Sequence, residues 1–389
     1  MKKFKFVAVV LTLVMCFTMF AGCGSSDSAN TDTNTDTTDG DTIKIGFIGP
    51  LSGSTAMYGE AVCYGAKIYF DELNEQGGIN GKQVEYITYD SKGDPTEATN
   101  AYTRLVDEDG VVAIVGPVLT GETLAVAQLA AEDGVPVVTA SATGDSITDI
   151  GDTLFRTCFK DSFQGTKMAD YCGQVLSYTN VAILYNNADE YSVGLTDAFR
   201  AEAANAGVTV VAEESYASGD TDFKSQLTNI KNSGAQAIFF PFYYDECYLA
   251  MQQAKEVGVD VPFLGGDGLS GLTTIADVDT TVIEGAIYSD HFSADGGNDA
   301  TAEFKATYES LYGVTPMGFA YLACDAAMVI AEAVKNAAST DYADVVEAMK
   351  AVDMDCLTGH YVFDEDNNPI KEAAMTKVEN GENVFIEMF

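Results

Sequence analysis

The chain has 389 residues, of which 20 are basic and 59 acidic, giving a formal net charge of −39. This charge argues against nucleic-acid binding, which requires basic patches, and against contact with anionic lipid surfaces. It is typical of a solvated, repulsive surface. The sequence has two histidines, His291 and His360, and no pair of cysteines separated by two residues. Neither a metal site nor a histidine-based catalytic site is therefore expected.

The first residues have the features of a signal peptide. Three lysines among the first five residues precede the apolar stretch 6–20, whose 15 residues are short of the ~20 needed to cross a bilayer. The Phe-Ala-Gly-Cys that follows resembles the lipobox of bacterial lipoproteins, with Phe20 where leucine is usual. We predict a signal peptide at 1–22 and lipidation of Cys23. A plain cleaved signal beside a chance cysteine is the alternative.

Residues 24–41 contain no lysine, arginine or large apolar residue. Such a segment cannot bury enough surface to offset the entropy lost on folding. With Cys23 it is predicted to form a disordered, acidic tether at 23–41, with a reach of roughly 25 Å. Cleavage before Cys23 removes three lysines and leaves 367 residues with a net charge of −42, a length that suggests two domains.

From residue 42 onward, short β-rich runs alternate with amphipathic segments of helical period. The first series predicts strands at 42–50, 83–90, 111–117 and 136–141 and helices at 59–77, 94–109 and 121–133. The second predicts helices at 163–176, 191–207, 223–234 and 245–258 and strands at 180–186, 208–216, 235–242 and 261–266, with further units at 284–292 and 321–337. Asp94 and Pro95 have the pattern of an N-cap and a first helical residue. The alternation predicts an α/β protein with two doubly wound parallel-sheet lobes.

In open parallel sheets ligands bind at the carboxyl ends of the strands, so the loops that follow strands are the expected functional sites. These loops lie at 49–59, 116–123, 139–145, 185–194, 240–246 and 265–268. Gly266, Gly268 and Gly271 give the G-x-G-x-x-G spacing of a dinucleotide-binding loop. However, the residues that follow are a poor helix start, and the loop lies late in the second series. The glycines are instead expected to let the loop around Asp267 approach a ligand closely.

The loop sequences closely resemble those of one family. The blocks IGFIGPLSGSTAMYGE, NEQGGINGKQVE, DSKGDPTEATNA, SATGDSIT, FRTCFKDSFQG and FLGGDG stand in family order. They are similar to the branched-chain amino-acid-binding proteins of ABC transporters, the leucine/isoleucine/valine-binding family, from about residue 42 to the C-terminus. The resemblance implies a type I periplasmic-binding-protein fold, in which three crossings join two lobes.

The resemblance also implies a clamp for the α-carboxylate of an amino acid. Thr120 matches the family's carboxylate-binding hydroxyl, and Thr143, with the backbone of Ser141 and Ala142, matches the second part of the clamp. Hydroxyl groups and the unpaired N–H groups of a helix N-terminus suit an anion. The alternatives are that Thr120 only caps the helix that follows and that 141–143 is only a Ser/Thr-rich turn.

By the same resemblance, Asp267 matches the acidic partner of the ligand's ammonium group, one methylene shorter than the glutamate of some members. Tyr58, Tyr191 and Tyr243 match positions of the side-chain pocket, and Leu119 is expected beside them. Two alternatives stay open. Asp-Gly is common in turns for local reasons, and in a chain with 20 tyrosines any one of them can serve packing alone.

Some positions depart from the family pattern. The loops at 90–95 and 116–121 lack the cysteines that join them in some members, Tyr58 stands where some members have tryptophan, and Glu122 adds an acid beside the clamp. These departures leave the amino-acid clamp intact. They leave open whether leucine, isoleucine, valine or an unbranched amino acid is preferred.

The implied function is capture and delivery of an amino acid. Lobe 1 is expected at 42–160 and 292–363 and lobe 2 at 161–291 and 364–389, with a hinge closing them over the ligand. The closed form, a lipid-anchored monomer at the extracytoplasmic face of the cell membrane, would deliver the ligand to a permease powered by an ATPase. No cofactor and no enzymatic step are expected. An amino-acid or small-amide sensor of the same fold acting through a partner receptor is the main alternative, ahead of a nucleotide-dependent enzyme.

Overall fold

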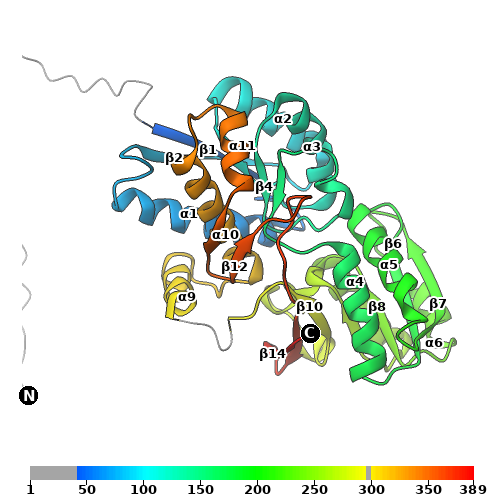
Figure 1. The fold of residues 1–389 in the computed structure, drawn as a ribbon. Coiled ribbons are helices and arrows are strands. Elements are labelled where there is room, and N and C mark those ends of the chain that lie inside the picture. Colours follow the sequence, from blue (N-terminus) through cyan, green and yellow to red (C-terminus); the bar gives the residue numbers. More distant parts are fainter. Residues whose placement is uncertain (1–41, 295–298) are drawn as a thin grey trace, which may run out of the picture. The chain divides into compact units, whose positions relative to one another are not determined.

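The computed structural model describes residues 42–294 and 299–389 (Figure 1). The predicted signal peptide, lipidated Cys23 and tether lie outside these residues. In the described ranges the chain forms two large sheets and one small one. None of the helices described there is long and apolar enough to cross a membrane.

The first large sheet has five parallel strands in the order β2-β1-β3-β4-β5. The strands are β1 (Thr42–Gly49), β2 (Gln83–Asp90), β3 (Ala113–Val115), β4 (Val137–Thr139) and β5 (Leu154–Arg156). The direction of winding reverses between β1 and β3. The loops after these two strands therefore diverge and open a crevice at the carboxyl edge of the sheet.

Helices cover both faces of this sheet (Figure 1). They are α1 (Ala56–Glu75), α2 (Pro95–Thr103), α3 (Thr120–Asp133), α9 (Asp299–Tyr312), α10 (Gly318–Asn336) and α11 (Tyr342–Lys350). Successive side chains of a strand point to opposite faces. Phe47 of β1 accordingly packs in the core shared by α1 and α10, whereas Ile48 packs in the core shared by α2 and α3. Helix α10 thus returns from late in the chain to pack on α1.

The second large sheet has seven strands in the order β14-β13-β10-β9-β8-β6-β7. They are β6 (Asn180–Asn186), β7 (Thr209–Tyr216), β8 (Ala237–Phe240), β9 (Phe263–Gly265), β10 (Ile287–Asp290), β13 (Ala374–Glu379) and β14 (Glu382–Met388). Strands β6 to β10 are parallel and repeat the winding order of the first sheet. Strand β13 is antiparallel to β10 and forms a hairpin with β14.

The second sheet is also covered on both faces. Its helices are α4 (Asp161–Asp170), α5 (Glu190–Ala203), α6 (Lys224–Lys231), α7 (Tyr244–Val257) and α8 (Thr280–Ile283). Ile183 of β6 packs with α4 and α5, and its neighbour Leu184 packs with α6 and α7. Both lobes therefore follow one rule, in which an apolar strand buried on both sides separates two helical layers.

Shorter elements complete the described chain. The 3₁₀ turns are η2 (Asp145–Ile147), η4 (Asp267–Leu269) and η5 (Leu272–Thr274), and single π-helical turns are η1 (Arg104–Asp109) and η3 (Tyr171–Val175). Strands β11 (Asp353–Asp355) and β12 (His360–Val362) form the small antiparallel sheet.

The chain passes between the two large sheets three times. The first connection, 157–160, joins β5 to α4, and the second leaves β10 at His291 and leads to α9. The third, 363–373, joins β12 to β13. Each of the two lobes is therefore assembled from separate stretches of chain.

The predicted fold class is confirmed, and so is the N-cap at Asp94, whose carboxylate accepts hydrogen bonds from Thr96 N (2.8 Å) and Glu97 N (3.0 Å). The pattern did not predict the β11–β12 pair or the β13–β14 hairpin. In β14, an edge strand paired only with β13 in the sheet, every residue except the half-buried Phe385 is exposed. Its sequence therefore lacks the apolar run that marks a buried parallel strand.

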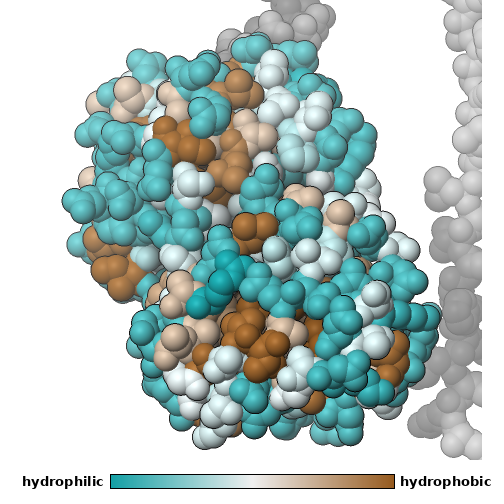
Figure 2. Space-filling model, turned by 90° about the vertical axis from the view of Figure 1, so that its right-hand side faces the viewer, coloured by the Kyte–Doolittle hydropathy of each residue, from teal (hydrophilic) through white to brown (hydrophobic). Residues whose placement is uncertain are grey.

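Hydrophilic side chains dominate the face drawn in Figure 2, with smaller hydrophobic areas between them. This distribution agrees with the solvated, acidic surface expected from the net charge. Cys63, Cys158, Cys172, Cys247, Cys324 and Cys356 are free thiols, and all but the last are buried. They pack as small apolar side chains.

Candidate ligand-binding site

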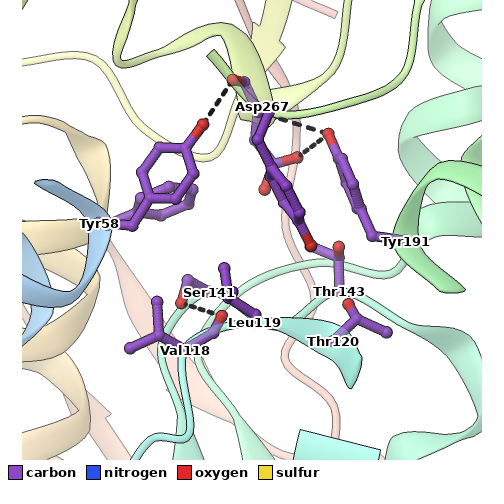
Figure 3. A pocket seen from close by; sticks show the side chains of 11 residues that line it. Tyr58, Val118, Leu119, Thr120, Ser141, Thr143, Tyr191 and Asp267 are labelled. Carbon is purple, nitrogen blue, oxygen red and sulfur yellow. Dashed lines mark hydrogen bonds between the residues drawn. The ribbon is translucent and has the colours of Figure 1, made fainter. Parts of the chain in front are cut away.

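A cavity is lined by side chains from both large lobes of the fold (Figure 3). About 260 Å³ of space without protein atoms, part of it open to solvent, lies between its lining residues. The lining residues are Tyr58, Val118, Leu119, Thr120, Ser141, Thr143, Tyr191, Tyr243, Asp267, Gly268 and Phe319. Eight of the nine predicted site residues are among them. Ala142 is buried but does not line the cavity.

The loops after strand ends supply nearly the whole lining. Tyr58 follows β1, residues 118–120 follow β3, and residues 141–143 follow β4. From the second sheet, Tyr191 follows β6, Tyr243 follows β8, and Asp267 and Gly268 follow β9. Phe319 comes from the first turn of α10. The winding order of the two sheets therefore brings these residues together.

One side of the cavity is the N-terminus of α3. Thr120 is the first residue of that helix and Leu119 precedes it, so the alternative that Thr120 is the N-cap is wrong. Its hydroxyl oxygen accepts a hydrogen bond from Gly144 N (3.2 Å). The N–H groups in the first turn of a helix have no acceptor within the helix and carry partial positive charge. This side of the cavity is therefore suited to an anionic group.

The loop 141–144 lies beside this helix N-terminus. The hydroxyl of Thr139 accepts from Ala142 N (3.0 Å), so this predicted donor is already engaged. Arg156 is fully buried and donates to the carbonyl oxygens of Thr143 (3.0 Å) and Gly144 (2.9 Å). It thereby fixes the loop and adds a positive charge behind the predicted carboxylate clamp.

Asp267 lies on the opposite side of the cavity from Thr120 and Thr143 (Figure 3). Its Oδ1 accepts from the hydroxyl of Tyr191 (2.8 Å) and from Gln164 Nε2 (3.0 Å). Its Oδ2 is 2.9 Å from His291 Nε2. The residue is 3% exposed. A buried carboxylate is normally paired with a cation. The group that balances the charge of Asp267 therefore indicates what the cavity can bind.

The groups bonded to Asp267 or packed beside it in the described part of the chain are neutral or acidic. Burial lowers the pKa of His291, although its hydrogen bond to Asp267 acts in the opposite direction. Burial raises the pKa of Asp161 well above its usual range, and the negative charge of Asp267 raises it further, so Asp161 favours its neutral form. The Asp267 end of the cavity therefore carries negative potential without a protein cation bonded to it.

Aromatic rings form the walls of the cavity. The rings of Tyr191 and Tyr243 are stacked at 5.1 Å, and Tyr58 meets Phe319 edge to face at 5.3 Å. Burial raises the pKa of each of these tyrosines well above its usual range, so their hydroxyls stay neutral. Together with Leu119 they offer an apolar surface to a ligand.

Direct hydrogen bonds cross the cavity from one lobe to the other. The hydroxyl of Tyr58, on α1, donates to the carbonyl oxygen of Gly268 (2.5 Å) and accepts from Tyr244 N (3.2 Å). The hydroxyl of Tyr244 donates to the carbonyl oxygen of Ser54 (2.5 Å). These contacts join loops of the two lobes directly.

The glycines around Asp267 permit close packing. A Cβ on Gly266 would lie 2.7 Å from Gln164 Oε1 and 2.9 Å from the Tyr191 hydroxyl, and one on Gly268 would lie 2.6 Å from the carbonyl oxygen of Phe242. The loop continues as the 3₁₀ turn η4 and does not open an α-helix. A phosphate site of the dinucleotide type needs such a helix N-terminus, so this interpretation of the glycine spacing is excluded.

Comparison with known proteins agrees with this geometry. Residues 42–383 match the family described as periplasmic binding protein. The chain belongs to the periplasmic binding protein family. The resemblance and the fold class predicted from the sequence are thereby confirmed, and the family is one of solute-binding proteins.

Among the relatives of this periplasmic binding protein is the leucine-, isoleucine-, valine-, threonine- and alanine-binding protein of Pseudomonas aeruginosa. It is 32% identical over 84% of this chain and 86% of its own length. The leucine-binding protein LivK of Thermotoga maritima is 30% identical, with a TM-score of 0.83 over 89% of this chain and 98% of that one. LivJ of Streptococcus pneumoniae, a branched-chain amino acid transporter substrate-binding protein solved with isoleucine, is 35% identical, with a TM-score of 0.84 over 90% and 99% of the two chains.

Several residues of the site were not predicted. Val118, Gly268 and Phe319 line the cavity, and Gln164, Asp161, Arg156 and His291 support it. Val118 and Gly268 could have been found as direct neighbours of predicted residues. As a side chain, His291 was considered only for a catalytic or metal-binding role, within the predicted unit 284–292; in the structure it directly follows β10. The described residues hold no cluster of His, Cys, Asp or Glu that could bind a metal ion.

Proposed function

We propose that this periplasmic binding protein captures an α-amino acid with a branched aliphatic side chain and delivers it to an ABC importer. The observation that carries the proposal is the polarity of the small cavity. The N-terminus of α3 lies on one side of it, and the buried Asp267, bonded to neutral groups, lies on the other. An α-amino acid carries the complementary pair of charges on two groups attached to the same carbon atom.

In this proposal the α-carboxylate binds at the clamp. The hydroxyls of Thr120 and Thr143 and the first-turn N–H groups of α3 are its donors. Thr143 N adds a further donor, because it forms no hydrogen bond within the described chain. Arg156 acts from behind by holding the loop and contributing positive potential.

The ammonium group binds at Asp267. Three donors from Tyr191, Gln164 and His291 hold the carboxylate in one orientation. They leave its negative charge uncompensated, so the ligand supplies the missing cation. A charge-assisted hydrogen bond in a dry cavity is stronger than a neutral one. This arrangement favours amino acids over their uncharged amides or α-hydroxy analogues.

The side chain of the ligand packs against Leu119 and the rings of Tyr58, Tyr191 and Tyr243. A branched-chain preference is supported by relatives named for leucine, isoleucine and valine binding.

Binding is coupled to closure of two lobes, which we propose to consist of residues 42–160 with 292–363 and 161–291 with 364–389. The three connections act as the hinge. The ligand favours the closed form because only that form lets the clamp and Asp267 contact it together. A signal peptide at 1–22, lipidation at Cys23 and a tether to residue 41 would hold the protein at the extracytoplasmic face of the membrane. There a permease with its ATPase accepts the ligand, and no covalent step occurs.

Isothermal titration calorimetry on residues 42–389 tests this proposal. Leucine, isoleucine and valine should bind, with the matching amides and α-hydroxy acids as controls that lack one of the two charges. Failure of every α-amino acid in the panel to bind would overturn the ligand class. Binding of an aromatic amino acid in preference to all aliphatic ones would overturn the proposed side-chain preference.

A further inference from the structure

His291 lies at the point where the second connection leaves β10. The residue is 3% exposed, and its imidazole packs against the ring of Phe159, on the first connection, at a centroid distance of 3.7 Å. The ring of Phe319, on α10, is also near the imidazole, at a centroid distance of 5.7 Å. His291, itself on the second connection, therefore contacts the first connection through Phe159 and the cavity wall through Phe319.

The hydrogen bonds of the ring define its tautomer. Phe159 N donates to Nδ1 of His291 (3.4 Å), so Nδ1 acts as an acceptor and carries no proton. In a neutral imidazole the proton then lies on Nε2. Nε2 is 2.9 Å from Oδ2 of Asp267 and donates to it. The ring thus joins a backbone N–H of the hinge to the carboxylate in the cavity.

The charged and titratable groups that interact with His291 or with its partner Asp267 come from several elements. They are Asp267 after β9, Arg156 on β5, Asp161 on α4, Asp290 on β10, Cys158 on the first connection and Lys371 on the third. Burial lowers the pKa of His291, the bond to Asp267 raises it, and the positive charges of Lys371 and Arg156 lower it again. The neutral ring is the form that this environment favours.

A neutral donor has a specific consequence at this position. An imidazolium would form an ion pair with Asp267 and cancel the negative potential that an ammonium group requires. A neutral Nε2–H satisfies one lone pair of the buried carboxylate and leaves its charge in place. We propose that His291 is a positioning residue that holds Asp267 as an anion facing the ligand and links its orientation to both hinge connections. This inference rests on the proposed role of Asp267 as partner of the ligand's ammonium group.

Two substitutions separate the hydrogen bond from the packing. His291→Phe keeps a ring between Phe159 and Phe319 but removes the donor, whereas His291→Gln keeps an amide donor. His360→Gln is the matched control, because the imidazole of His360 is exposed and lies outside the site. Leucine affinity should fall about 10- to 100-fold in His291→Phe, as expected for a lost hydrogen bond to a charged group, and recover to within about fivefold of wild type in His291→Gln.

The ligand itself supplies the decisive comparison. The α-keto acid of leucine has the same side chain and carboxylate but no ammonium group. His291→Phe should leave its weaker binding unchanged within about threefold, because the loss acts through Asp267. In an Asp267→Asn background, His291→Phe should cause little further loss for leucine. Nitrogen NMR of the wild-type protein should show a neutral ring protonated at Nε2, and leucine affinity should decrease at acidic pH as the ring becomes charged.

Three results would overturn the inference. They are equal losses for leucine and its keto acid, full additivity of the two substitutions, and a ring that is charged or protonated at Nδ1 near neutral pH. Should His291→Phe fail to fold, the wild-type nitrogen spectra and the His291→Gln titrations decide the matter. If wild type binds leucine and Asp267→Asn abolishes binding while His291→Phe does not weaken it, this inference fails and the proposed function stands. If wild type binds no α-amino acid, the proposed function fails first.

Discussion

Replacement of Asp267 by asparagine tests the ligand's proposed charge partner directly. The carboxylate is buried, with the residue 3% exposed, and accepts from Tyr191, Gln164 and His291, all neutral donors. The substituted side chain would carry no charge and would present one amide NH₂ to donors that require an acceptor. Loss of one member of a buried charge pair costs about 2–5 kcal/mol, which corresponds to an affinity for an amino acid roughly 30- to 4,000-fold lower.

Calorimetry and thermal unfolding measure this loss independently. At a leucine concentration of about 1,000 times the wild-type Kd, the ligand should stabilise wild type by about 4.1 kcal/mol. A variant that binds 100-fold more weakly would gain about 1.4 kcal/mol at the same concentration. If the calorimetric loss of affinity accounts for the smaller stabilisation by leucine, the variant binds more weakly but folds normally. A variant that is also less stable without leucine has a damaged fold.

Asp260→Asn provides the matched control, because Asp260 is exposed on the same lobe and its replacement changes the net charge equally. That variant should bind leucine as wild type does. An Asp267→Asn affinity within about threefold of wild type would refute the counter-ion role. A loss of equal size in Asp260→Asn would instead indicate a general effect of protein charge.

Three other substitutions test the rest of the site. Thr120→Val removes the hydroxyl bonded to Gly144 N, so calorimetric leucine affinity should fall about 5- to 100-fold, and unchanged affinity would leave Thr120 a packing residue only. Tyr58→Phe removes the hydroxyl that joins α1 to Gly268, so affinity should fall about 2- to 13-fold with the unfolding temperature of the free protein little changed; unaltered binding would argue against a role in closure. Burial raises the pKa of Glu122 to about 7, above the ordinary 4.5, so its stabilising contribution is complete below about pH 4.5 and is lost as the pH rises through about 7. Glu122→Gln should therefore flatten the fall in urea-unfolding free energy between about pH 5 and 8, and an identical pH profile in both proteins would contradict this.

The strand and helix pattern located the loops of the site, and the resemblance to one family indicated the residues within them. The predicted site residues all follow strand ends, and every one of them except Ala142 lines the cavity, because parallel sheets collect such loops at one edge. Asp94 could be assigned as an N-cap because an Asp-Pro pair before a helical pattern has a local physical cause. Thr120 was harder to assign, because a threonine at a helix start fits an N-cap and a first helical residue equally well. Only the structure places it one position inside α3.

Residues that support the site but are distant from it in the sequence could not be found in this way. Arg156, Gln164 and His291 lie on three different segments, and nothing in their immediate neighbours indicates a common target. Gln164 is 103 positions from Asp267 in the sequence, and its side chain both donates to that carboxylate and accepts from the backbone N–H. Such partners come together only in the folded protein, because each lobe is assembled from discontinuous stretches of chain.

The amino-acid sequence by itself determined the alternating strands and helices, the doubly wound class of both lobes and the identity of the loops at their carboxyl edges. These follow from hydrophobic period and turn chemistry, which act over a few residues. The tertiary structure decided what surrounds Asp267. Its neutral donors, the distant Arg156 behind the clamp and the hydrogen bonds of Tyr58 across the cavity depend on contacts between remote segments. The electrostatic character of a buried carboxylate is set by those neighbours rather than by its own sequence context.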